Sequence, residues 1–118
     1  MANKLYAMEL LTEEVAKDVA ANPQEWMRFL NTASRLYRYT FPEQLLIYAQ
    51  RPGATAVASM EIWNQKMYRW IKKGSKGIAL IDNTSGPKTK LRYVFDVQDT
   101  YKVKNPVSYT HLRAHETD

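Results

Sequence analysis

The 118-residue sequence contains no cysteine, which excludes disulfide bonds, thiolate nucleophiles and cysteine-based zinc sites. It also lacks any apolar run close to the roughly 18 residues that a membrane-spanning helix needs. The amino terminus has no continuous apolar core of the kind found in a signal peptide. We therefore expect a cytoplasmic protein with no membrane partner. With 45% hydrophobic and 25% charged residues, this length predicts one globular domain.

Histidine is nearly absent too, and the position of the two histidines bears on whether they belong to the natural protein. The two histidines, His111 and His115, both lie close to the carboxyl terminus. Residues Val107–Thr117 resemble the translation of a transposase end joined to a sequencing adapter. We therefore predict that residues 106–118 are a non-native tail, and that the natural reading frame is cut short near Asn105. Residues 1–105 then carry 16 basic and 10 acidic side chains, and neither histidine nor cysteine.

Residues 1–105 lack the side chains that catalysis usually requires. Without a histidine base, the serines and threonines cannot form an acyl-transfer triad. Asp96 and Asp99 lie three residues apart but have no histidine to complete a metal site. The segment Gly74–Gly77 does not have P-loop spacing. Because it lies between predicted strands, we interpret it as a tight basic turn. We expect a protein that is not an enzyme and has no metal site and no cofactor.

Helical signals fill the first half of the sequence. Thr12 is a candidate N-cap for a helix whose apolar positions recur one turn apart. A second helix is predicted to begin after Asn22, with Pro23 at its first position and Glu25 closing a capping box. Its apolar residues recur at helical spacing and define one buried face. They are Trp26, Phe29, Leu30, Ala33, Leu36 and Tyr37.

Two further helices are predicted before the pattern changes. Thr40 begins a segment that is apolar nearly all round as far as Ala49, as expected of a helix in the core. The sequence 51–53, Arg-Pro-Gly, predicts its end, because the residue before a proline avoids helical angles. Ser59 is predicted to start a short helix that runs to Met67.

The second half has the pattern of strands. Residues 68–71 and 77–81 are strand-like runs joined by a lysine-rich turn, which predicts a hairpin. The continuous apolar run at 78–81 favours a central strand. After a predicted turn at Asn83–Pro87, residues 91–97 alternate between apolar and polar, as in a half-buried strand. Helices first and strands afterwards predict an α+β fold, a helical amino-terminal half packed on a small, mainly antiparallel β-sheet.

Positive charge is concentrated among the predicted strands. Residues 1–63 have six basic and seven acidic side chains, whereas residues 64–92 have eight basic side chains against Asp82 alone. Aromatic residues lie on the same strands. This combination suits single-stranded nucleic acid, because bases stack on aromatic rings while lysines neutralise phosphates. A solvated basic turn with the aromatic residues in the core explains the same composition, and both interpretations stay open.

A set of short motifs spans residues Trp26 to Asp99. They include Tyr37–Phe41, Gln44–Pro52, Lys73–Leu80 and Arg92–Val97. With these motifs the segment resembles the ArdC-type amino-terminal domain of antirestriction proteins and of large conjugative-element proteins from Firmicutes. The resemblance implies a module of a larger mobile-element protein, with single-stranded DNA as its partner. In that family a metalloprotease-like domain, or helicase and methylase regions, follows, so it also implies further carboxy-terminal domains in the natural chain.

The predicted binding residues follow from the charge pattern and the resemblance together. They are Arg69, Lys72, Lys73, Lys76, Lys90, Arg92, Tyr68, Tyr93 and Arg51, with Gln50 as a further hydrogen-bonding group. Trp70 is either a stacking platform or a core residue. Little sequence specificity is expected, because no helix with base-reading side chains is identifiable. The alternatives are a protein-docking module that positions a downstream helicase, methylase or metalloprotease domain, and an enzyme fragment whose site is completed elsewhere.

Overall fold

The computed structural model describes residues 2–82 and 90–102, and both the predicted turn at Asn83–Pro87 and the predicted tail at 106–118 lie outside them. The helices are α1 (Ala2–Ala21), α2 (Pro23–Ala33), α3 (Phe41–Gln50) and α4 (Met60–Gln65). The strands are β1 (Val57–Ala58), β2 (Arg69–Ile71), β3 (Ile78–Asp82), β4 (Lys90–Asp96) and β5 (Thr100–Lys102), with a 3-10 turn, η1 (Val97–Asp99), before the last. The predicted α+β class is confirmed, with the helical half packed on a small antiparallel sheet.

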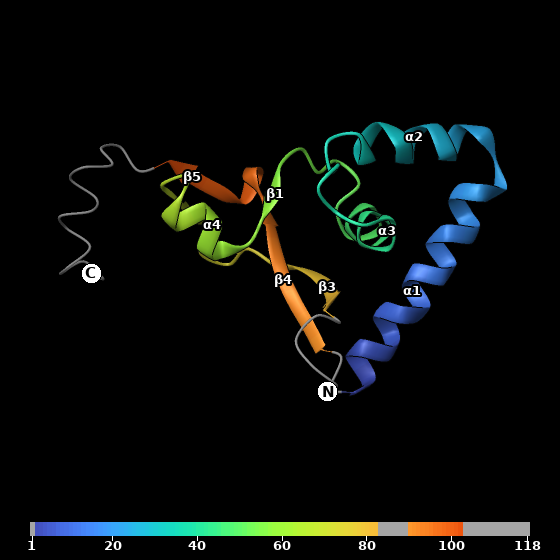
Figure 1. Cartoon of the computed structure of the whole chain (residues 1–118), viewed down its shortest axis with the longest axis horizontal. Helices are drawn as coiled ribbons and strands as arrows, with labels where there is room; N and C mark the ends of the chain where they lie inside the picture. Colours follow the sequence, from blue (N-terminus) through green and yellow to red (C-terminus); the bar gives the residue numbers. More distant parts are fainter. Residues whose placement is uncertain (1, 83–89, 103–118) are drawn as a thin grey trace.

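The elements form three groups in space. Figure 1 shows α1, α2 and α3 at one end, the sheet of β1, β4 and β3 in the middle, and α4 with β2 and β5 at the other end. None of the helices in the described ranges is long and apolar enough to cross a membrane.

Helix α1 begins at Ala2, well before the predicted cap. Thr12 lies inside the helix, where its Oγ1 donates to the carbonyl oxygen of Met8 over 2.9 Å. This back-bond satisfies a hydroxyl group within a helix. The predicted start was therefore wrong, because nothing in the residues before Thr12 interrupts a helix. Val15 and Val19 are buried, in line with their one-turn spacing.

Helix α2 begins as predicted, but its cap is simpler. The Asn22 side chain accepts a hydrogen bond from the backbone N–H of Glu25 over 2.7 Å, which confirms the N-cap. The Glu25 carboxylate is used elsewhere, since it accepts hydrogen bonds from Arg28 (2.6 Å) and from the Tyr48 hydroxyl (2.7 Å). The Glu25 side chain thus ties α2 to α3 instead of closing a capping box.

The predicted apolar face of α2 is only half buried. Phe29, Ala33 and Leu36 are buried, whereas the other three predicted residues, Trp26, Leu30 and Tyr37, are exposed. The helix ends at Ala33 and packs against α1 and α3 on one side only. The buried face predicted from spacing alone was therefore too wide, and it included Leu36 and Tyr37, which lie beyond the end of the helix.

Helix α3 is the core helix, as its composition predicted. Thr40 and Glu43 form a reciprocal capping box at its start, and the helix ends at Gln50. Four consecutive residues of α3, 45–48, are buried. The main core lies between this helix and the sheet and consists of Leu36, Leu46, Ile47, Ala54, Ile78, Leu80 and Val94. Ser59 caps α4 as predicted, accepting a hydrogen bond from the Ile62 N–H.

The middle sheet has the order β1–β4–β3, with both pairs antiparallel. The predicted strand at residues 91–97 corresponds to β4 and is confirmed. However, β4 is the central strand and β3 lies at the edge, so the prediction of a central strand at 78–81 was wrong. Ile78, Ala79 and Leu80 of β3 are buried because α3 and α1 pack against the strand.

The predicted hairpin of residues 68–71 with 77–81 does not form. Strand β2 pairs with β5 in a separate two-stranded sheet, with Trp70 opposite Tyr101. A hairpin partner would have to pair with the free edge of β3. At Ala79 the Gln50 side chain occupies this edge, forming hydrogen bonds to the N–H and carbonyl groups of Ala79. The lysine-rich turn therefore connects two sheets instead of two paired strands.

Candidate functional site

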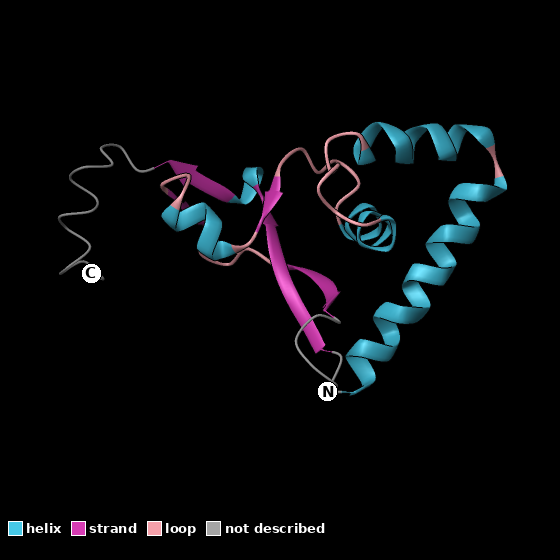
Figure 2. Cartoon of the chain, in the orientation of Figure 1, coloured by secondary structure: helices cyan, strands magenta, loops and turns pink. Residues whose placement is uncertain are grey.

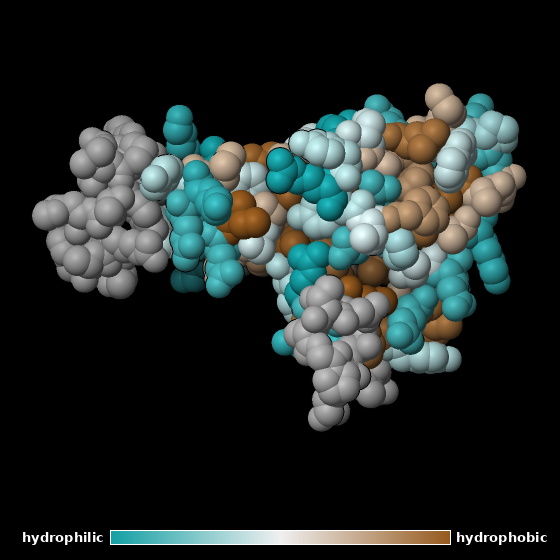
Figure 3. Space-filling view, in the orientation of Figure 1, coloured by the Kyte–Doolittle hydropathy of each residue, from teal (hydrophilic) through white to brown (hydrophobic). Residues whose placement is uncertain are grey.

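Basic side chains gather at the end of the molecule that carries α4, β2 and β5. We call residues 60–77 and 100–102 the basic lobe. Its single acidic residue is Glu61, and its six basic residues are Lys66, Arg69, Lys72, Lys73, Lys76 and Lys102. Figure 3 shows hydrophilic side chains beside a small apolar patch at this end of the molecule, and a mixture of apolar and hydrophilic side chains over the helical end.

The lysine-rich turn of the lobe has a defined shape. The Ser75 N–H donates to the carbonyl oxygen of Lys72 over 3.1 Å, and Gly74 has a φ of +86°. A positive φ at the third position is what a type II β-turn requires, and glycine adopts it without strain. Lys73 at the second position is exposed, and within the described residues no hydrogen bond or ion pair engages its ammonium group.

The turn is fastened to η1, so its lysines have a fixed base. The Lys72 N–H donates to the carbonyl oxygen of Asp99 over 2.8 Å. The Lys72 ammonium group donates to the carbonyl oxygen of Gln98 over 3.1 Å. Lys76 is exposed at the far end of the turn and lines a hollow of about 330 Å³ together with Arg51. Two cations, Lys73 and Lys76, thus project from an anchored loop.

The β2–β5 sheet places two cations directly opposite each other. Arg69 is the cross-strand partner of Lys102. The Arg69 guanidinium group is held by Thr100, donating to its Oγ1 (2.6 Å) and to its carbonyl oxygen (3.3 Å). Like charges on opposed strand residues destabilise a sheet. An anion bound beside Arg69 and Lys102 would relieve this repulsion.

Aromatic side chains neighbour these cations along the strands, and the Trp70–Tyr101 pair, one position away, lies on the other face of the two-stranded sheet. Tyr101 is 50% exposed and lies opposite Trp70, and Tyr68 is 40% exposed. Trp70 itself is half-buried, an exposure intermediate between that of a core residue and that of an exposed stacking platform. Tyr68 has a φ of +56°, in the left-handed region that side chains with a Cβ rarely adopt. An exposed ring held in a strained conformation is more typical of functional sites than of ordinary surface.

Tyr101 and Lys102 were not among the residues predicted from the sequence. Strand β5 has three residues, too few to show the alternation that identifies a strand. The only available signal was the continuation of positive charge to Lys102. Tyr101 and Lys102 join the site only because β5 pairs with β2, which is distant in the sequence. A local sequence pattern does not predict such a pairing.

Three predicted site residues, Lys90, Arg92 and Tyr93, lie on β4 in the other sheet. A strand rises about 3.3 Å per residue, so Lys90 is about 20 Å from η1 along this strand. Arg92 forms an ion pair with Glu43 over 2.8 Å. Tyr93 is nearest to the lobe, because its Cβ lies 3.1 Å from the position that a Cβ on Gly77 would occupy. The predicted set is therefore divided between two sheets.

The two predicted binding residues at the end of α3 have partners inside the protein. Arg51 forms a two-point ion pair with Asp99, with distances of 2.6 and 3.2 Å. The hydrogen bond to Asp99 raises the pKa of Arg51 above its usual value. The Gln50 side chain bonds to Ala79 and to the carbonyl oxygen of Leu46. Both side chains thereby fix the fold beneath the basic lobe.

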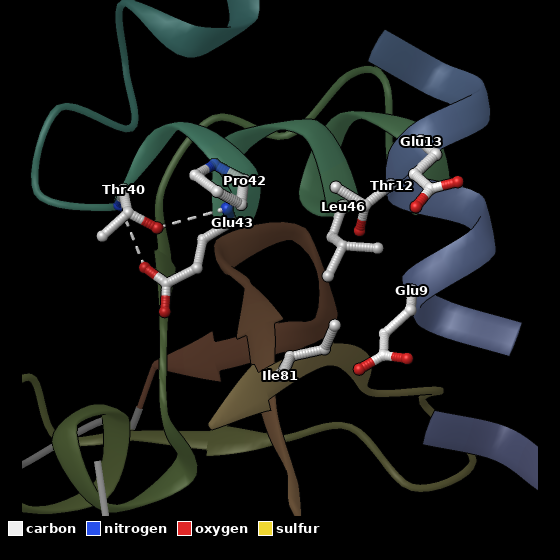
Figure 4. A pocket seen from close by; sticks show the side chains of 8 residues that line it. All are labelled: Glu9, Thr12, Glu13, Thr40, Pro42, Glu43, Leu46 and Ile81. Carbon is white, nitrogen blue, oxygen red and sulfur yellow. Dashed lines mark hydrogen bonds between the residues drawn. The ribbon is translucent and has the colours of Figure 1, made fainter. Parts of the chain in front are cut away.

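A hollow of about 470 Å³ between α1, α3 and β3 has the opposite charge. Figure 4 shows Glu9 and Glu13 on α1 and Glu43 at the start of α3 around it, with the capping hydrogen bonds between Glu43 and Thr40. Its acidic rim repels a polyanion, so this hollow is not part of the candidate site. No group of three or more potential metal ligands occurs among the residues that the structure describes.

Comparison with protein-family models, with curated proteins and with solved structures yields no match for this chain.

Proposed function

We propose that this chain is a module that binds single-stranded nucleic acid through the basic lobe. The observation that carries the proposal is the opposition of Arg69 and Lys102 in the β2–β5 sheet. The same lobe carries the exposed lysines Lys73 and Lys76 and the exposed tyrosines Tyr68 and Tyr101. Phosphates neutralise the cations, and unpaired bases stack on the rings. The lobe offers no long helix for a duplex groove, since α4 has only six residues.

Within this class, we assign the chain to the ArdC-type amino-terminal domains. It is then a non-catalytic, mostly sequence-independent DNA-binding module of a larger mobile-element or antirestriction protein. The supporting motifs are Gln44–Pro52 and Lys73–Leu80, which lie far apart in the sequence. They meet in the fold, because Gln50 of the first motif forms hydrogen bonds to Ala79 of the second. The motifs thus act as one structural unit that supports the lysine-rich turn.

The direct test compares single-stranded and duplex DNA of the same length and sequence by fluorescence anisotropy, over a series of salt concentrations. We expect tighter binding to the single strand, because only unpaired bases expose their faces to the tyrosines. The logarithm of the association constant is expected to fall linearly with the logarithm of salt concentration. Equal or tighter binding to the duplex refutes the single-strand preference, and no binding to either at low salt refutes the function.

A second function is favoured by the helical end of the molecule. Trp26, Met27, Leu30 and Phe41 are exposed there. Aromatic residues and methionine are enriched at protein interfaces. A protein-docking module would use this surface to position a downstream domain. Replacing Met27 with Asp would then release the downstream domain in a salt-insensitive manner, and the affinity for single-stranded DNA would not change.

A further inference from the structure

We infer that Tyr37 and Arg38 form a second base-stacking site, which a single strand reaches after it leaves the basic lobe. This inference rests on the proposed function and adds to it a site at the helical end. Neither residue was predicted to bind nucleic acid. The ligand class is an unpaired base with its flanking phosphate.

The first observation is the exposure of the Tyr37 ring. At 76%, it is the most exposed large hydrophobic side chain in the described part of the protein. The Arg38 guanidinium carbon lies 5.7 Å from the ring centroid, and the Arg38 Nε donates to the Tyr37 hydroxyl oxygen over 3.4 Å. A ring and a cation presented together match the two parts of a nucleotide, since the base stacks and the phosphate pairs with arginine.

The second observation is that the backbone around the ring is fixed. The Tyr39 hydroxyl donates to the carbonyl oxygen of Val57 over 2.9 Å. The Arg35 Nε donates to the carbonyl oxygen of Ala54 over 3.0 Å. Residues on both sides of Tyr37 are therefore anchored, Arg35 to the loop between α3 and β1 and Tyr39 to β1, while the ring itself points away from the core. A platform that is already ordered loses little conformational entropy when a ligand binds.

The third observation is a series of hydrogen bonds that links this corner to the basic lobe. Figure 2 shows the loop between α2 and α3 beside the loop between α3 and β1, and the Arg35 bond to Ala54 joins them. On its other side the second loop is joined to η1, because the Gln98 side chain donates to the carbonyl oxygen of Gly53 over 3.2 Å. Lys72 in turn binds Gln98. The corner and the lysine-rich turn therefore lie on two sides of one loop.

Charge permits a strand to follow this route. Residues 34–40 and 51–58 contain no aspartate or glutamate, and they contain Arg35, Arg38 and Arg51. The neighbouring carboxylate of Asp99 is paired with Arg51, and that of Asp96 is buried and accepts hydrogen bonds from backbone N–H groups of residues 55, 56 and 98. Glu43, which accepts a hydrogen bond from the Thr40 N–H, is paired with Arg92. The carboxylates beside this route are therefore paired or buried, and Arg35 and Arg38 are the cations that a phosphate would meet.

The test uses oligothymidylates of about 4 and about 16 nucleotides, the limits of the site sizes known for OB-fold single-strand-binding proteins. In the full chain, Tyr37→Ser should weaken binding of the longer probe at least about fivefold, the lower limit for loss of one base–aromatic stack. Binding of the shorter probe, which the basic lobe alone accommodates, should not change. The matched control is Tyr6→Ser, which removes a tyrosine that is 62% exposed on α1.

A second measurement separates stacking from a change in the fold. Tyr37→Trp should retain the affinity for the longer probe, and its fluorescence should be quenched by that probe, whereas Tyr6→Trp should add no quenching. If wild type binds the longer probe and Tyr37→Ser binds it equally well, this inference is wrong and the proposed function stands. If wild type binds neither probe at low salt, the proposed function itself fails. If Tyr6→Ser weakens binding as much as Tyr37→Ser, the ring at position 37 has no special role.

Discussion

The side-chain amide of Gln50 pairs with both backbone hydrogen-bonding groups of Ala79. Its Nε2 donates to the Ala79 carbonyl oxygen over 2.8 Å, and its Oε1 accepts from the Ala79 N–H over 2.9 Å. This is the pattern that a neighbouring strand would provide. A single side chain thus occupies the free edge of β3 at Ala79, and an exposed strand edge otherwise invites pairing with another chain.

Replacing Gln50 with Leu should therefore destabilise the fold. The change leaves the N–H and carbonyl groups of the buried Ala79 without partners, at a cost of about 2–3 kcal/mol in the free energy of unfolding. Urea denaturation measures this loss. Gln24→Leu, at an exposed position in the first turn of α2, is the matched control and should change stability by less than about 0.5 kcal/mol. Equal stability of the two variants would show that water replaces the amide.

Alkaline pH should weaken the fold through Tyr39. Burial raises the pKa of its hydroxyl group, which the nearby Arg92 partly opposes and Glu43 reinforces. Because the folded-state pKa lies above the unfolded value of about 10, the neutral side chain contributes fully below pH 10. This contribution is lost as the pH rises through the folded pKa. Stability should therefore fall above about pH 10.

Tyr39→Phe isolates this effect. The variant loses the hydrogen bond to the Val57 carbonyl oxygen, at about 1 kcal/mol near neutral pH, and its stability should fall less steeply above about pH 10. A remaining slope is expected from Tyr48, because burial and the hydrogen bond with Glu25 raise its pKa as well. Thermal melts from neutral to alkaline pH give the comparison, and an unchanged slope in Tyr39→Phe would refute the assignment.

The lysine-rich turn should carry much of the salt dependence of binding. Replacing Lys72, Lys73 and Lys76 with Gln should weaken binding to single-stranded DNA. The log–log salt slope should flatten by about 0.7 for each phosphate that a lysine no longer neutralises. Stability should change by less than about 1 kcal/mol, because all three side chains are exposed.

Two variants serve as comparisons for the lysine substitutions. The triple variant Lys4→Gln, Lys17→Gln and Arg28→Gln removes the same charge from α1 and α2 and should leave the slope nearly unchanged. Arg51→Gln should also preserve the slope, since Asp99 holds its guanidinium group, and should instead lower stability. If the control triple flattens the slope as much as the turn triple, net charge and not the turn determines the affinity.

Tyr68 should show opposite effects on stability and on binding. Its left-handed backbone costs about 1–2 kcal/mol for a residue with a Cβ, whereas asparagine adopts this region more readily. Tyr68→Asn should therefore keep stability or raise it by up to about 1 kcal/mol, and it should weaken binding by about 1–3 kcal/mol through loss of one stack. A lower melting temperature with unchanged affinity would show that the ring serves the fold only.

Local signals in the sequence sufficed wherever the interaction itself is local. The N-caps at Asn22, Thr40 and Ser59 were predicted, because a capping side chain bonds to a backbone N–H only three residues away. The burial of α3 was predicted from its composition, since a helix that is apolar all round has no face to expose. The same reasoning failed for Thr12, because a hydroxyl group can bond within a helix as well as at its end.

Only the tertiary structure decided which strands pair, and hence which side chains lie opposite each other. The sequence by itself determined the α+β class, the core helix and the concentration of lysines in the second half. Strand pairing depends on which edges are free, and Gln50 fills the edge of β3 from a distant helix. Strand β2 therefore pairs with β5, and Arg69 faces Lys102, a juxtaposition that no local pattern encodes. Likewise, Arg51 looks like a free cation in the sequence, and it is the folded position of Asp99 that makes it an internal partner.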